Sequence, residues 1–138
     1  MKDVAYIALG SNLGQREVFL AQARRAIADL PTTRVLGLTD AEETAPIGPV
    51  AQGPFLNQMI AIETELSPQD LLAELKRIEI AAGRVRAARW GPRTLDLDIV
   101  LFENQSVREP GLTVPHPELS NRDFWLRELA ALRSSRVG

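Results

Sequence analysis

Two aspartates, Asp96 and Asp98, follow an arginine-rich segment and lead into the apolar run 99–102. On a strand, residues two apart share a face and lie about 6–7 Å from each other, so both carboxylates would point the same way. A solvated strand face with alternating acid and leucine is the alternative. An unpaired carboxylate near a core is costly, however, which favours ion pairing or metal binding. Oxygen ligands select a hard cation, so the pair predicts a Mg²⁺ site rather than a zinc site.

The arginine-rich segment 84–93 carries Arg84, Arg86, Arg89 and Arg93 and contains no carboxylate. Metal-binding acids beside such a cationic segment indicate polyphosphate chemistry. Trp90 could stack on a base or hold the segment by packing. Two other interpretations stay open: a solvated charged loop, and a site for single-stranded nucleic acid held by arginine and aromatic stacking.

Composition narrows the class of protein. The chain has 138 residues, 45% of them apolar, with a net charge of −2 and a pI near 5.5. That charge argues against a nucleic-acid binder working through bulk positive charge. The absence of cysteine excludes a disulfide framework, and a single histidine, His116, excludes a multi-histidine metal centre within one chain. We find neither a signal-peptide pattern nor a membrane span, and expect a cytoplasmic protein.

Apolar periodicity predicts six elements. Strands are expected at 4–9, 35–44, 58–64 and 95–102, and helices at 19–30, ended by Pro31, and at 67–82, ended by Gly83. The order βαββαβ indicates an α+β, ferredoxin-like sandwich in which helices cover an antiparallel sheet. The connections 45–54 and 83–94 are longer than this fold needs, so we expect functional loops there.

Two motifs have competing interpretations. The segment 10–14 (GSNLG) matches neither phosphate-loop pattern, and we interpret it as a helix cap. His116, between Pro115 and Pro117, could donate to a phosphate or be a plain turn residue. Phe55, Asn57 and Phe124 read individually as core and turn residues.

With these residues in view, the chain resembles the 6-hydroxymethyl-7,8-dihydropterin pyrophosphokinases of folate biosynthesis. The stretch 89–99 (RWGPRTLDLDI) carries a highly specific signature. Shorter matches are 6–13 (YIALGSNL), 44–49 (TAPIGP), 55–57 (FLN), 77–79 (RIE), 83–86 (GRVR) and 114–116 (VPH). The similarity spans about residues 4–126.

The resemblance implies transfer of pyrophosphate from ATP to the pterin hydroxymethyl group, with release of AMP. It implies two Mg²⁺ ions on Asp96 and Asp98, and catalytic roles for Arg84, Arg93 and Asp98. It places the nucleotide against Lys76, Glu79, Arg86, Trp90, Arg93, Ile99, Thr113, His116 and Arg122. It places the pterin against Thr44, Pro46, Ile47, Phe55, Asn57 and Phe124.

The sequence therefore predicts one pyrophosphokinase domain over residues 1–138, monomeric, with ATP and the pterin as its partners and neither nucleic acid nor membrane. The rival is a noncatalytic ligand- or nucleic-acid-binding module on the same fold. The enzyme would make AMP from ATP, whereas the module would consume nothing and lose affinity steeply with salt.

Overall fold

The computed structural model describes residues 2–45, 52–83 and 94–137, and within them it confirms the predicted ferredoxin-like plan. The six expected elements are β1 (Asp3–Ser11), α1 (Arg16–Ala28), β2 (Thr33–Leu38), β4 (Phe55–Thr64), α2 (Pro68–Ala81) and β5 (Asp96–Phe102). Five further elements are β3 (Glu42–Thr44), β6 (Val107–Glu109), β7 (Leu112–Val114), the 3₁₀ turn η1 (Leu119–Asn121) and α3 (Asp123–Val137).

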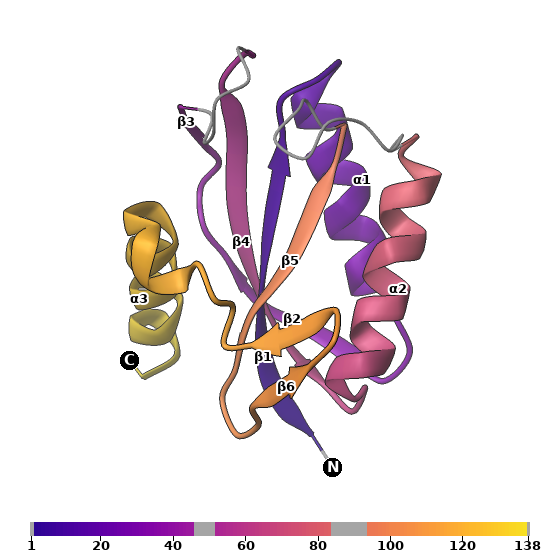
Figure 1. The fold of residues 1–138 in the computed structure, drawn as a ribbon, viewed down its shortest axis with the longest axis vertical. Helices are drawn as coiled ribbons and strands as arrows, with labels where there is room; N and C mark the ends of the chain where they lie inside the picture. The colour runs from indigo at the N-terminus through magenta and orange to yellow at the C-terminus, as the bar shows by residue number, and fades with distance from the viewer. Residues whose placement is uncertain (1, 46–51, 84–93, 138) are drawn as a thin grey trace.

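The main sheet has the strand order β2-β4-β1-β5, with β3 added beside β4, and every pair is antiparallel. β1 lies in the interior of the sheet and all nine of its residues are buried, as its unbroken apolar run predicts. Helices α1 and α2 cover one face of the sheet, and α3 covers the other (Figure 1). β6 and β7 form a separate hairpin after β5.

The two faces of the sheet bury separate cores. Ile7 and Ile60 belong to the cluster under α1 and α2, whereas Tyr6 and Met59 belong to the cluster under α3. Along β4, Met59 and Ala61 face α3 whereas Ile60 and Ile62 face α1 and α2, because successive strand residues point to opposite faces. A side chain on β5 therefore faces either α1 and α2 or α3. The face on which Asp96 and Asp98 lie decides on which side of the sheet the candidate site is found.

Helix α2 has clear local signals at both ends. The Ser67 hydroxyl accepts a hydrogen bond from the backbone N–H of Asp70 at 3.0 Å, and Pro68 occupies the first turn. After the last turn, Gly83 adopts a φ of +82°, which a glycine tolerates without strain. The expected boundaries of this helix are confirmed.

Three local expectations are wrong. Gly10 and Ser11 still belong to β1, and α1 begins at Arg16 after Gln15, which makes no side-chain capping bond, so 10–14 is not a helix cap. α1 also ends at Ala28, before Pro31. The expected strand 35–44 is two strands, β2 and β3, that pair with different stretches of β4.

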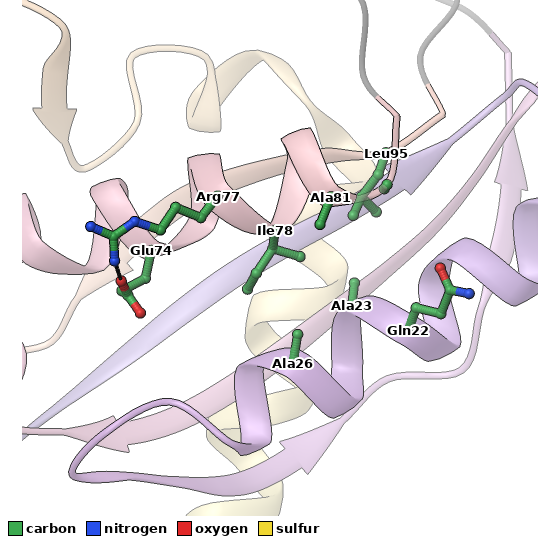
Figure 2. A pocket seen from close by; sticks show the side chains of 9 residues that line it. Gln22, Ala23, Ala26, Glu74, Arg77, Ile78, Ala81 and Leu95 are labelled. Atoms are coloured by element: carbon green, nitrogen blue, oxygen red, sulfur yellow. Dashed lines mark hydrogen bonds and ion pairs between the residues drawn. The ribbon is translucent and has the colours of Figure 1, made fainter.

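A shallow apolar groove separates α1 from α2 (Figure 2). Alanines from both helices and Leu95 line it, and an ion pair between Glu74 and Arg77 lies at its edge. The groove encloses about 270 Å³. It lies on the side of the sheet away from α3.

Candidate active site

Asp96 and Asp98 share the α3 face of β5. In the register with β1, Asp96 is opposite Gly10 and Asp98 is opposite Ala8, which belongs to the core under α3. Leu97, between them, is buried in the core under α1 and α2. Both aspartates are only partly buried. The two carboxylates therefore lie side by side on one face, as their spacing predicts, and solvent can reach them.

His116 stands beside Asp98, with its Nε2 3.6 Å from Asp98 Oδ1. Its backbone N–H donates to Val100 O at 2.9 Å, which fixes the residue against β5. Its Nδ1 accepts the backbone N–H of Glu118 at 3.0 Å, so the neutral ring carries its proton on Nε2, toward Asp98. A separation of 3.6 Å is too long for a hydrogen bond but lies within ion-pair distance of the carboxylate.

Arg122 brings a positive charge to the same face. Its guanidinium carbon lies 4.2 Å from the centroid of the Trp125 ring, and the His116 ring meets that indole edge-on at 4.9 Å. Trp125 is buried, so it fixes both side chains. Within the described parts of the chain, no carboxylate lies within ion-pair distance of Arg122, and its Nε is buried without a hydrogen-bond partner. A guanidinium in this state is suited to an anionic ligand.

A hollow of about 270 Å³ opens beside β5, between α2 and the β6–β7 hairpin. Asp98, Ile99, Thr113 and His116 all line it. The structure thus brings together three of the predicted nucleotide residues and one predicted metal ligand. Lys76 is exposed on α2 and does not line this hollow.

Glu79 is buried, and its contact with β5 is structural. Its Oε2 accepts the backbone N–H of Leu97 at 2.7 Å. That amide lies between the two aspartates, so the bond holds the start of β5 on α2. A contact between Glu79 and the nucleotide stays a prediction.

Four of the predicted pterin residues are described. Thr44 pairs with Phe55 across β3 and β4, and the Asn57 amide donates to the Thr44 hydroxyl. A Cβ added to Gly10 would lie 3.3 Å from Asn57 Oδ1 and 3.4 Å from Phe55 Cδ1. Glycine therefore leaves open the space between these side chains and β5. Phe124, at the start of α3, packs against the core on the same face.

The other predicted site residues are Pro46, Ile47, Arg84, Arg86, Trp90 and Arg93, and they lie outside the described residues. Sequence reasoning missed Trp125, which holds His116 and Arg122. The signal was available, because Trp125, Leu129 and Leu132 recur at helical spacing and are all buried.

Comparisons with known proteins bear on the family of this chain. A family model described as 7,8-dihydro-6-hydroxymethylpterin-pyrophosphokinase (HPPK) matches residues 6–134. A 2-amino-4-hydroxy-6-hydroxymethyldihydropteridine pyrophosphokinase of Haemophilus influenzae is 45% identical over 96% of this chain and 83% of its own length. The enzyme of the same name from Bacillus subtilis is 43% identical over 96% of this chain and 79% of its own length.

A solved structure of an HPPK-DHPS in complex with substrates has a TM-score of 0.59 at 14% identity, and supports the fold alone. The match covers 79% of this chain and 29% of that one. The family model and the curated relatives, which cover nearly the whole chain, decide its family. The chain belongs to the 7,8-dihydro-6-hydroxymethylpterin-pyrophosphokinase family.

Proposed function

We propose that this protein transfers the β,γ-pyrophosphoryl group of ATP to the hydroxymethyl oxygen of 6-hydroxymethyl-7,8-dihydropterin, releasing AMP, as a step of folate biosynthesis. One observation carries the proposal. Asp98 and His116 line a hollow at β5, and Asp98 shares the α3 face of the sheet with the side chains expected to hold a pterin. Family membership supports the same reaction.

The chemistry requires positioning and charge stabilisation rather than a covalent nucleophile. The pterin hydroxyl oxygen attacks the β-phosphorus and passes its proton to the Asp98 carboxylate, the bond from that phosphorus to the α,β-bridging oxygen breaks, and AMP leaves with the electron pair. Arg122 and the Nε2–H of His116 offer donors to the phosphate oxygens as negative charge shifts toward AMP. Ile99 and Thr113 contribute walls for the nucleotide.

The pterin is a flat heterocycle with a polar edge. Aromatic rings such as Phe55 and Phe124 suit its faces, and the amide of Asn57 suits its edge. Asn57 is already oriented by its bond to Thr44. Holding the hydroxymethyl group in line with the phosphate supplies much of the rate enhancement expected for such an enzyme.

We also propose that the site binds Mg²⁺, and the available oxygen ligands suit this ion. Within the described residues no group of three or more histidine, cysteine or acidic side chains could hold a metal alone. Asp96 and Asp98 form a carboxylate pair, which suits Mg²⁺ because that ion retains waters and takes its other ligands from phosphates. Bound there, Mg²⁺ would neutralise phosphate charge and orient the reacting oxygens. We propose two such ions.

Further parts of the proposal are a single domain over 1–138, a monomeric state, a cytoplasmic location, and nucleotide contacts from Lys76, Glu79 and the arginines of 84–93. Within the described residues, no helix has the length and apolar character required to cross a membrane. Sedimentation equilibrium tests the monomer, which a concentration-independent mass of twice 15.2 kDa would contradict.

The decisive experiment is an assay of nucleotide products. With ATP, Mg²⁺ and reduced hydroxymethylpterin, we expect stoichiometric AMP and pterin diphosphate, and neither product without the pterin. ADP as the product would contradict pyrophosphoryl transfer. Consumption of no ATP, together with salt-sensitive binding of nucleic acid, would favour the noncatalytic module.

A further inference from the structure

Glu128 is a buried acid that the proposed reaction does not use. It lies on α3 with 5% of its surface exposed, and neither carboxylate oxygen has a hydrogen-bond partner among the described residues. An ionised carboxylate in such a position is costly, whereas a neutral carboxyl group costs far less. The proton on Glu128 therefore affects how tightly α3 packs on the sheet.

The charged groups around Glu128 favour its protonated form. Glu42 of β3 repels a second negative charge, and Arg127, the neighbouring cation on α3, is bonded to Glu42 at 3.3 Å. On the α3 face, β4 contributes the uncharged Met59 and Ala61. Burial first, and then Glu42, raise the pKa of Glu128 from 4.5 to about 7, against smaller opposing effects of Arg127 and of the Thr39 hydroxyl, which faces the carboxyl group without the geometry of a full hydrogen bond.

Glu128 and Glu42 are each close in the structure to residues that we expect to contact the pterin. On α3, Phe124 lies four residues before Glu128, so the two side chains project from the same side of the helix. On β3, Glu42 pairs with Asn57, and Thr44, two residues later, pairs with Phe55. Repulsion between Glu128 and Glu42 thus acts between the two elements that carry the expected pterin contacts.

We propose that Glu128 is a positioning residue that holds α3 against β3 while it is protonated, so that loss of its proton loosens Phe124 and weakens pterin binding. The inference rests on the proposed function for its ligand. The inference predicts that pterin affinity depends on pH near neutrality, through a side chain that is not one of the reacting groups. One linked proton allows at most about a tenfold change in affinity per pH unit.

Hydrogen exchange and pterin titration together test the inference on the whole protein. In the wild type, without substrates, we expect exchange of the α3 amides, corrected for the intrinsic pH dependence, to rise between pH 6 and 8.5. We also expect the Kd for 6-hydroxymethyl-7,8-dihydropterin to rise several-fold over that range. In Glu128→Gln, which is isosteric and always neutral, both profiles should be flat at the wild-type low-pH level.

Two further variants separate positioning from a general effect of pH. Glu17→Gln removes an exposed acid from α1, on the opposite face, and should keep the wild-type profiles. Glu42→Gln removes the repulsion and frees Arg127, so the midpoint of both profiles should move to lower pH.

Equal pH dependence in the wild type and Glu128→Gln would overturn the inference. If neither protein bound pterin at any pH, the proposed function and the pterin part of the inference would fail, whatever α3 exchange showed.

Discussion

At the scale of single residues, the site depends on neighbours that fix the direction of each polar group. The N–H of Glu118 occupies Nδ1 of His116, and this bond directs Nε2–H toward Asp98. The Trp125 ring fixes the Arg122 guanidinium in the same way. Ligand-binding groups held before the ligand arrives lose less conformational entropy on binding.

Asp98→Asn removes a charge that the proposed Mg²⁺ site requires while it preserves the shape of the side chain. We expect AMP formation to fall by about 100-fold or more, with an unchanged circular dichroism spectrum. Steady-state assays at saturating ATP and Mg²⁺ measure the loss. Asp29→Asn, at the exposed end of α1, is the matched control and should retain wild-type turnover. Near-normal turnover by Asp98→Asn would remove its metal role.

Arg122→Lys retains the charge but loses the planar group that stacks on Trp125. We expect the KM for ATP to rise about tenfold and the KM for the pterin to change little, because phosphate oxygens are the expected partners. Arg34→Lys, an exposed arginine paired with Glu63 on β2 and β4, serves as the control. Equal increases in both KM values would place Arg122 outside the nucleotide site.

At the scale of elements, the position of β5 depends on α2 as well as on β1. Glu79 is the link, because its carboxylate accepts the amide N–H of Leu97. Truncation to Glu79→Ala leaves that N–H without this partner and should lower the free energy of unfolding by about 1–3 kcal/mol. Urea denaturation measures the change. Glu74→Ala, on the same helix but in a surface ion pair, should cost less than about 1 kcal/mol. Equal losses would contradict the assigned bond.

Elements with strong local signals could be predicted from the sequence. Ser67, Pro68 and Gly83 mark the ends of α2, and the apolar run of β1 marks an interior strand. The β6–β7 hairpin was missed because its strands are three residues each, too short for periodicity to register. The face occupied by Asp96 and Asp98 could be predicted, since it needs only the two-residue repeat of a strand.

Contacts between segments that are distant in the sequence could not be predicted from local sequence patterns. The bond from Glu79 to Leu97 and the pairing of Glu42 with Asn57 depend on how α2 and β3 pack in three dimensions. Glu128 likewise reads as an ordinary surface acid in the sequence, and only the packing of α3 shows that it is buried. The family resemblance supplied the expected roles of Phe55, Asn57 and Phe124, which their spacing alone did not distinguish from core residues.

At the scale of the whole molecule, the larger apolar core and the proposed reactive groups lie on opposite faces of the sheet. The face under α1 and α2 buries the larger core, whereas the face under α3 combines a smaller core with Asp98, His116 and Arg122. The polar groups proposed to meet a ligand therefore lie on the face with the smaller core. Glu128, on α3, is a further polar group of this face, and it is buried without a hydrogen-bond partner among the described residues.

The pH dependence of global stability follows from this buried acid. Its pKa is raised from 4.5 to about 7 in the folded state, so the folded protein binds the proton more tightly than the unfolded chain. Stability from this group is complete below pH 4.5 and is lost as the pH rises through about 7. Glu128→Gln should match the wild type near pH 4.5 and exceed it by about 1–3 kcal/mol at pH 8. Urea denaturation at both pH values measures the difference, and an equal stability of the two proteins at pH 8 would show that Glu128 is solvated or paired in solution.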